Sequence, residues 1–213
     1  MRLYTYFRSS TAYRLRIALN WKGIAWEGIP VSLVKGEHRE GPYLAVNPQG
    51  GLPALEEEGQ PALAQSMALL DWLEETHPIP PLLPEGPRPR AMVRALAQVV
   101  ASEIHPLTNL RVLRHLRGGH GWSEAAAAAW VRHWTAEGLR AFEATLHRQG
   151  MHGDFCWGGM VTQAEVCLVP AIFNARRWEV DLAPFPLLTA IADRAAALPA
   201  FAAAHPALQP DAA

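Results

Sequence analysis

The fold of this chain is decided near its start, by the stretch LYTYFRSST (residues 3–11) and the segment AYRLRIALNWKG (residues 12–23) that follows it. The aromatic residues predict a short strand, the triplet Ser9-Ser10-Thr11 a tight turn, and the next residues a helix that ends at Lys22 and Gly23. Free backbone N–H groups and the positive end of the helix dipole meet at such a turn. With three hydroxyls and the charge of Arg8 beside them, they predict a site for a thiolate or an oxyanion.

The following segments extend this start into a small mixed sheet. Residues 26–34 predict a second strand, residues 54–64 a hairpin, and Ser66 the cap of a helix that ends before Pro78. Two parallel strands joined by a helix and followed by an antiparallel pair are typical of a mixed sheet with helices on its faces. Prolines then crowd the chain, so that neither a helix nor a central strand persists there. We therefore expect a sheet domain over residues 1–83 and a proline-rich linker over 84–89.

Residues 90–213 have the pattern of an all-helical domain, so the fold class is α/β followed by all-α. Helical periodicity runs over 90–116, interrupted by Pro106, and over 123–149, with Trp130 and Trp134 one turn apart. A third helix begins at Thr162 and a fourth near Pro186. The sequence Thr162-Gln163-Ala164-Glu165 fits a capping box, in which the threonine and glutamate side chains satisfy exposed N–H groups at the start of the helix.

Composition and charge exclude several classes of function. The chain has 213 residues, half of them hydrophobic, and its 19 basic and 20 acidic residues nearly cancel. This balance argues against a general grip on nucleic acid or on a membrane surface. Two cysteines are too few for a disulfide framework, and no secretory or membrane-spanning segment is evident, which indicates the cytoplasm. The nine histidines lack metal-site spacing, so no metal is expected.

Two further stretches point to a ligand. Asn47 to Leu55 places Pro53 directly before a strand, and a cis Leu52-Pro53 bond would turn the Leu52 backbone outward to pair with an extended peptide. An ordinary edge-strand start is equally compatible with this sequence. Gln65-Ser66 opens a helix, where N–H groups could hold a carboxylate. Together with the first turn, these stretches predict a site for a small peptide that carries a thiol and a carboxylate.

The combination resembles the zeta class of cytosolic glutathione transferases. The resemblance is carried by Arg8 to Leu19, Asn47 to Leu55 and Gln65-Ser66, and continues through Glu103 to Arg111 and Ala175 to Arg177, so it covers essentially the whole chain. It implies a thioredoxin-like N-terminal domain, an all-helical C-terminal domain that binds the substrate, glutathione as a cofactor in the cleft between them, and a homodimer.

The resemblance also implies roles for individual residues. The catalytic group would be Arg8, Ser9, Ser10 and Thr11, and Ser9 or Ser10 is favoured over Thr11 as the hydroxyl that bonds the sulfur. Substrate carboxylates would be bound by Arg8, Arg111 and Arg177, while Arg176 would face elsewhere. The glutathione-binding residues would be His38, Gln49, Leu52, Pro53, Gln65, Ser66, His105 and Asn109.

The implied activity is the glutathione-dependent cis–trans isomerisation of a maleyl keto diacid, maleylacetoacetate or maleylpyruvate, to its fumaryl isomer in aromatic catabolism. Many members of the class carry cysteine where this chain has Thr11, which leaves the choice between the two substrates open. Two alternatives remain: a general transferase or dehalogenase that acts on small α-halo acids, and a non-catalytic protein that binds glutathione.

Overall fold

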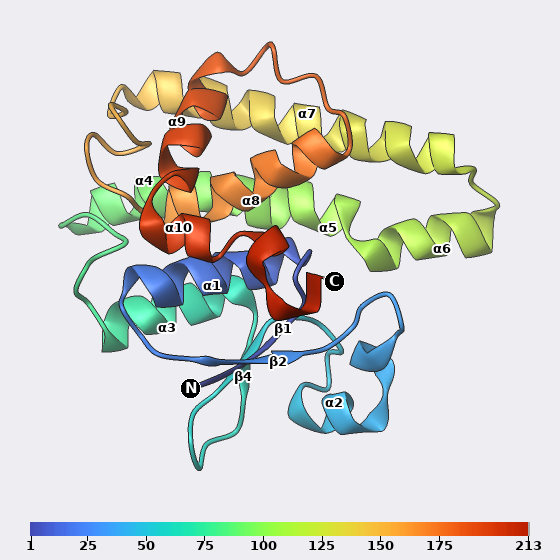
Figure 1. Ribbon diagram of the computed structural model, residues 1–213. Coiled ribbons are helices and arrows are strands. Elements are labelled where there is room, and N and C mark those ends of the chain that lie inside the picture. Colours follow the sequence, from blue (N-terminus) through green and yellow to red (C-terminus); the bar gives the residue numbers. More distant parts are fainter. Residues whose placement is uncertain (213) are drawn as a thin grey trace. The chain divides into compact units, whose positions relative to one another are not determined.

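A computed structural model describes residues 1–212 of the chain (Figure 1). The structure divides into two compact units. The first contains Met1–Leu82 together with the segment from Ala197 onward, and the second contains Leu83–Ala196.

The first unit is built on a four-stranded mixed sheet, as the sequence predicts. The strand order is β2-β1-β3-β4, in which β1 pairs parallel with β2 and antiparallel with β3, and β3 pairs antiparallel with β4. Helices α1 and α3 pack side by side on one face of this sheet (Figure 1). The elements are β1 (Arg2–Thr5), α1 (Ser10–Trp21), β2 (Glu27–Pro30), the 3₁₀ turn η1 (Glu37–Arg39), α2 (Gly41–Val46), β3 (Ala54–Glu56), β4 (Leu63–Ala64) and α3 (Ser66–Thr76).

Helix α1 ends where the first stretch predicts, but it begins earlier, because Ser10 and Thr11, predicted as part of the turn, are its first two residues. Ser9 is its N-cap, and the backbone of Lys22 caps the other end, followed by Gly23 at a φ of 65°, a left-handed conformation that glycine adopts at little cost. Every residue from Ala12 to Leu19 is buried, including two arginines. A helix surrounded on all sides in this way must pack against more than a sheet.

The C-terminal segment provides that additional cover. Helix α10 (Pro199–Ala203) packs along α1, where the Phe201 ring meets Trp21, and the 3₁₀ turns η3 (Pro206–Leu208) and η4 (Pro210–Ala212) follow it (Figure 1). The Asn20 side chain donates a hydrogen bond to the Ala200 carbonyl at 3.1 Å. The expected helical domain extends to residue 213, whereas in the structure the chain from Ala197 on belongs to the sheet unit. Local periodicity does not reveal this return, because the contacts join residues about 180 positions apart.

A buried ion pair closes the other end of α1. Lys22 Nζ lies 2.9 Å from Glu74 Oε2 of α3, and both side chains are almost entirely inaccessible to solvent. The ammonium also donates to the carbonyls of His77 and Pro80, while the carboxylate accepts the N–H of Leu82. Because both charges have further partners, their desolvation is compensated, and the pair fixes the exit of the chain from α3.

The second unit is mainly helical, with a non-helical segment between α7 and α8 that contains two isolated β-bridges. Its central helix α8 is buried from Gln163 to Ile172 and packs against α4 and α9 (Figure 1). Thr162 and Glu165 form the predicted capping box, and the Ser123 side chain caps α7. The elements are α4 (Pro87–Gln98), the π-helical turn η2 (Val99–Ile104), α5 (His105–Thr108), α6 (Leu110–His120), α7 (Glu124–Gln149), α8 (Gln163–Arg177) and α9 (Pro186–Ala196).

Two details around proline differ from the sequence prediction. Helix α4 begins at Pro87, inside the expected linker, because proline is tolerated in a first turn where its missing N–H would have no partner. The long helix expected over 90–116 does not break at Pro106. It widens into the π-helical turn before this residue, which relieves the clash of the proline ring with the preceding turn, and it breaks instead at the extended Asn109.

No helix in the part of the chain that the structure describes combines the length and the apolar character needed to cross a bilayer.

Candidate active site

The predicted thiolate turn is organised by a chain of hydrogen bonds between side chains and backbone. Ser9 Oγ accepts the N–H of Ala12 at 3.2 Å and lies 3.0 Å from Thr11 Oγ1, and Thr11 Oγ1 donates to the Leu52 carbonyl at 2.8 Å. A hydroxyl has one proton. The Thr11 hydroxyl donates its proton to the Leu52 carbonyl, so Ser9 must be the donor in the Ser9–Thr11 hydrogen bond. The Ser9 proton is therefore the one that can rotate toward a ligand. Ser10, partly exposed, is the first residue of α1.

Arg8 stands beside this turn and is held by its own neighbours. Its guanidinium lies 5.0 Å from the centre of the Phe7 ring, and Nη2 donates to the Tyr6 hydroxyl at 3.2 Å. The side chain is exposed, so its charge remains available to an anion near the turn.

The loop before β3 is fixed by polar side chains. The Gly51 carbonyl accepts hydrogen bonds from the Tyr43 hydroxyl and from Asn47 Nδ2, the latter at 2.8 Å. Gly50 has a φ of 59°, and a Cβ at this position would lie 3.0 Å from the carbonyl of the buried His38, so any other residue would be strained here. The Leu52-Pro53 bond that follows is cis, one of the two possibilities that the sequence allows.

The start of α3 forms a second polar centre. Gln65 has a φ of 72°, a conformation uncommon for residues other than glycine, and occupies the N-cap position without a side-chain capping bond. Ser66, predicted as the cap, is instead the first helical residue. Gln65 Nε2 donates to Gln49 Oε1 at 2.6 Å, which joins this centre to the loop before β3. The positive end of the α3 dipole therefore favours an anion at this start, where the Gln65 side chain makes no capping bond.

Arg14 lies beneath this second centre and is a candidate that sequence reasoning missed. Its side chain is 1 % exposed, and Nη1 donates to Ser66 Oγ at 3.1 Å. A buried guanidinium under a helix start adds positive charge where an acidic group would bind. The available signal was two arginines, Arg14 and Arg16, within an otherwise apolar helix.

The other expected site residues lie in the second unit. His105 Nε2 and Asn109 Nδ2 are 3.1 Å apart, so the two side chains meet. They do not share one helix as expected, because Asn109 is extended and caps α6, where its Oδ1 accepts the N–H of Arg111 at 3.0 Å. The Arg111 side chain is exposed at the start of that helix.

Two adjacent arginines end α8 in different environments. Arg176 forms an ion pair with Asp193 at 2.8 Å. Arg177 donates to Asn174 Oδ1 at 3.0 Å and lies 5.6 Å from the centre of the Trp178 ring. The structure thus distinguishes the two neighbours.

The remaining reactive side chains do not form a competing centre. Cys156 and Cys167 are free thiols with no exposed surface. Burial, reinforced by the neighbouring Glu165 carboxylate, raises the pKa of the Cys156 thiol well above its ordinary value, which disfavours a thiolate. Within residues 1–212 no group of three histidine, cysteine, aspartate or glutamate side chains is placed to hold a metal ion.

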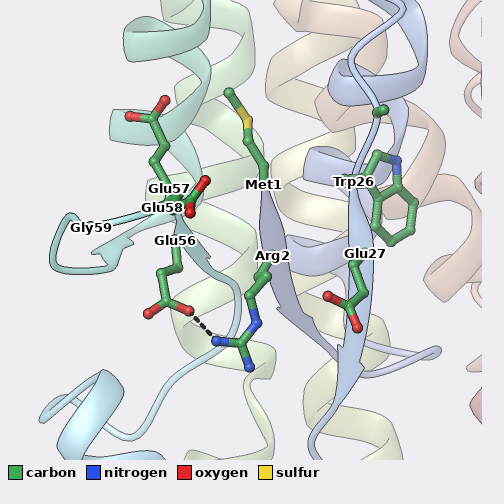
Figure 2. A pocket seen from close by; sticks show the side chains of 9 residues that line it. Met1, Arg2, Trp26, Glu27, Glu56, Glu57, Glu58 and Gly59 are labelled. Carbon is green, nitrogen blue, oxygen red and sulfur yellow. Dashed lines mark hydrogen bonds and ion pairs between the residues drawn. The ribbon is translucent and has the colours of Figure 1, made fainter.

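A separate depression of about 610 Å³ lies at the end of the sheet where β1 begins (Figure 2). It is lined by Met1, Trp26 and several glutamates, among which Glu56 forms an ion pair with Arg2 at 2.9 Å. None of the expected site residues lines it. Its acidic wall is unsuited to an anionic ligand, so the candidate active site remains at the Ser9 turn and the start of α3.

Comparison with known proteins identifies the family of this chain. The family model described as "Glutathione S-transferase, N-terminal domain" matches residues 3–86. The chain is 48 % identical to the maleylacetoacetate isomerase of Rhizobium meliloti over 204 residues, which cover 96 % of this chain and 95 % of the relative.

Solved structures match over the full length. One is the holo structure of a maleylpyruvate isomerase described as a bacterial zeta-class glutathione transferase, with a TM-score of 0.97, 45 % identity and complete coverage of both chains. Another is the maleylacetoacetate isomerase of Methylobacterium extorquens AM1 with bound malonate and glutathione, with a TM-score of 0.97, 41 % identity and complete coverage of both chains. The expectation drawn from the sequence is confirmed: the chain belongs to the zeta class of the glutathione transferases.

Proposed function

We infer that this chain is a glutathione-dependent cis–trans isomerase that converts a maleyl keto diacid, maleylacetoacetate or maleylpyruvate, to its fumaryl isomer. The observation that carries this proposal is the hydrogen-bond chain Ser9–Thr11–Leu52, in which one hydroxyl proton can turn toward a ligand. Full-length relatives named for the two isomerases support the choice of reaction.

The first task of such an enzyme is to keep the glutathione sulfur ionised. A free thiol has a pKa of about 8.5, so at neutral pH the protein must favour the thiolate. We assign this task mainly to Ser9, whose hydroxyl would turn from Thr11 to the sulfur, assisted by Ser10 and the N-terminus of α1. Thr11 would instead hold the Leu52 carbonyl, and so link the turn to the peptide-binding loop.

The rest of the tripeptide would lie along the first unit. The γ-glutamyl carboxylate would bind the start of α3 through Gln65 and Ser66, with the Arg14 charge below it, and the cysteinyl backbone would pair with Leu52. Further contacts are proposed for His38, Gln49 and Pro53 of the same unit and for His105 and Asn109 of the second.

Catalysis would then proceed by reversible addition. The thiolate attacks one carbon of the cis double bond, and the electron pair of that bond moves into the conjugated ketone as an enolate. The former double bond is now single and rotates. Return of the enolate electrons expels the sulfur, which leaves the trans product and regenerates glutathione, so the cofactor is not consumed. The protein supplies ionisation of the thiol, positioning and charge stabilisation.

The substrate carboxylates require positive charge, and arginine binds carboxylates in a bidentate geometry. We propose Arg8, Arg111 and Arg177 for this role. Arg176 is a weaker candidate for binding a substrate carboxylate because it already forms an ion pair with Asp193. The malonate bound in the Methylobacterium relative is a small dicarboxylate, which is consistent with such a site.

We also propose that the first unit carries glutathione and the helical unit the substrate site, and that the protein acts as a homodimer in the cytoplasm. Family resemblance supports these assignments. Sedimentation of the purified protein would test the dimer directly.

Four reaction mixtures test the function: maleylacetoacetate and maleylpyruvate, each with and without glutathione. We expect turnover of at least one substrate only when glutathione is present. Turnover that is unaffected by removal of glutathione would contradict the mechanism. Dehalogenation of α-halo acids without isomerisation would favour the transferase alternative, and retention on immobilised glutathione without any turnover would favour a binding protein.

A further inference from the structure

The C-terminal segment reaches the thiolate turn through one carboxylate. Asp211 Oδ2 accepts the backbone N–H of Phe7 at 2.9 Å, although 204 positions separate the two residues. Phe7 lies two residues before Ser9, in the short connection between β1 and α1. The contact therefore joins the end of the described chain to the backbone that leads into the proposed sulfur site.

The other side of the same residue is held by a buried arginine. Arg16, with no exposed surface, donates from Nη2 to the Phe7 carbonyl at 2.9 Å and from Nη1 to Thr5 Oγ1 at 3.0 Å. Its Nε donates to the Ala204 carbonyl at 3.1 Å, which belongs to the C-terminal segment. Both polar backbone groups of Phe7 are thus bound, one by Asp211 and one by Arg16.

Charge complements this geometry. Burial lowers the pKa of Arg16 to about 10, and the negative charge of Asp211 acts in the opposite direction, which favours the protonated form. At neutral pH a guanidinium cation and a carboxylate anion therefore flank the connection.

The conformation of Ser9 depends on this connection. The Ser9 N–H donates to the Tyr6 carbonyl at 2.9 Å, and the Ser9 carbonyl accepts the N–H of Tyr13 at 2.8 Å. A shift of Phe7 would pass through this tight turn to the Ser9 side chain. Hydrogen bonds to a developing or resident charge depend steeply on donor placement, and a displacement of about 1 Å can cost about 100-fold in rate.

We propose that Asp211 is a positioning residue for the thiolate site: by holding the Phe7 amide, its carboxylate keeps Ser9 and the start of α1 in one orientation toward the glutathione sulfur. This inference rests on the proposed function. It assigns the C-terminal segment a part in catalysis without contact with the reacting atoms.

Whether the pKa of the bound glutathione thiol rises or falls in an Asp211 variant distinguishes a positioning role of Asp211 from a direct effect of its negative charge. Asp211 is negative, so removal of its charge alone would favour a nearby thiolate and lower the pKa of the bound thiol. Loss of a positioned donor would raise that pKa. Asp211→Ala removes both the charge and the acceptor, whereas Asp211→Asn removes the charge but keeps an oxygen that can accept the Phe7 N–H.

The test is a pH titration of the ultraviolet absorbance of the thiolate in protein-bound glutathione, with kcat measured on the same samples. We expect Asp211→Ala to raise the pKa of the bound thiol by about 1, a tenfold change in ionisation, and to lower kcat about tenfold. Asp211→Asn should stay within about twofold of the parent protein in kcat. Asp181→Asn is the matched control, because its carboxylate also accepts a backbone N–H, that of Ala183 at 3.0 Å, in an exposed loop. It should leave both quantities unchanged.

Two results would overturn the inference: an unchanged thiol pKa in Asp211→Ala, with or without a lower melting temperature, and an equal lowering of that pKa in both Asp211 variants. If Asp211→Ala does not fold, Asp211→Ser provides the same comparison with a side chain one bond shorter. If the parent protein shows no thiolate absorbance from bound glutathione, the proposed function is contradicted, and so is this inference.

Discussion

At the scale of single residues, the Ser9 turn shows how two hydroxyls of similar chemistry come to have different roles. Thr11 donates its hydroxyl proton to the Leu52 carbonyl, while Ser9 donates to Thr11 and can rotate its proton toward a ligand instead. The sequence analysis predicted the cluster and favoured Ser9 or Ser10 over Thr11, but it could not give the reason, because that reason is the bond from Thr11 to Leu52, 41 positions away.

Substitution of the two residues should therefore have different effects. Ser9→Ala removes the donor assigned to the thiolate, and a hydrogen bond to a charged group is worth about 1.5–3 kcal/mol, so kcat should fall about 10- to 100-fold. Thr11→Val keeps the shape but releases the Leu52 carbonyl, which should raise the KM for glutathione more than it lowers kcat. Steady-state kinetics with varied glutathione measures both. A larger loss of kcat in Thr11→Val than in Ser9→Ala would reverse the assignment.

A buried tyrosine near the loop before β3 gives a prediction at alkaline pH. Burial is the main cause that raises the pKa of Tyr43 to about 12, compared with 10 for the exposed side chain. Between these values the unfolded chain has released the proton and the folded chain still holds it. The contribution of Tyr43 to the free energy of unfolding is therefore fully present below pH 10. As the pH rises to 12 this contribution is lost, and the loss amounts to at most about 2.7 kcal/mol.

The variant Tyr43→Phe isolates this effect, because Tyr13 and Arg16, which titrate in the same range, are present in both proteins. We expect it to be less stable at neutral pH by about 1 kcal/mol, through loss of the bond to Gly51, but to lose less stability between pH 10 and 12. Urea unfolding at a series of pH values measures the difference. Parallel stability curves for the two proteins would contradict the assignment.

At the scale of helices and strands, the sequence was most informative where an element carries its own end signals. Ser123 and Thr162 each precede a helix that begins within one residue of the predicted position, because their capping bonds are local. Strand β2 is only four residues long, whereas the pattern predicted residues 26–34, since pairing with β1 sets where a strand ends. Residues with partners nearby in sequence were thus predictable, and those with distant partners were not.

The capping box of α8 should contribute more stability than an exposed cap. Thr162 Oγ1 accepts the N–H of Ala164 at 3.2 Å and donates to Glu165 Oε2 at 2.8 Å, and both side chains are fully buried. Thr162→Ala removes a partner from a buried carboxyl group as well as a cap, so it should cost about 2 kcal/mol. The exposed cap Ser123, which accepts the N–H of Ala126 at 3.1 Å, is the matched control, and Ser123→Ala should cost about 1 kcal/mol or less.

Chemical denaturation of the two variants gives this comparison, and kcat of the folded fraction should be unchanged in both. Equal destabilisation by Thr162→Ala and Ser123→Ala would mean that the buried hydrogen bond between Thr162 and Glu165 adds no stability beyond that of an ordinary helix cap. A large loss of kcat in Thr162→Ala would instead show that the start of α8 affects the catalysed reaction.

At the scale of the whole molecule, the main departure from the sequence prediction is the return of the segment from Ala197 to the sheet unit. The sequence places Arg16 within an apolar helix but does not show what it contacts, because its partner Ala204 is 188 positions away. The same limit applies to Arg14 and Ser66. Family resemblance supplied the site residues, while the structure supplied the bonds that support them.

The proposed reaction also needs the second unit, and the adjacent arginines of α8 test that requirement. Arg177→Ala should raise the KM for the diacid about 10- to 100-fold, because loss of a charge-assisted bond to a carboxylate costs about 1.5–3 kcal/mol, while the KM for glutathione stays unchanged. Arg176→Ala removes the same charge one residue earlier but breaks only an exposed ion pair with Asp193, worth about 1 kcal/mol or less. Its kinetics should match the parent protein. Identical kinetics in both variants would place Arg177 outside the substrate site, and an equal rise in KM in both would show that only the net charge of this region matters.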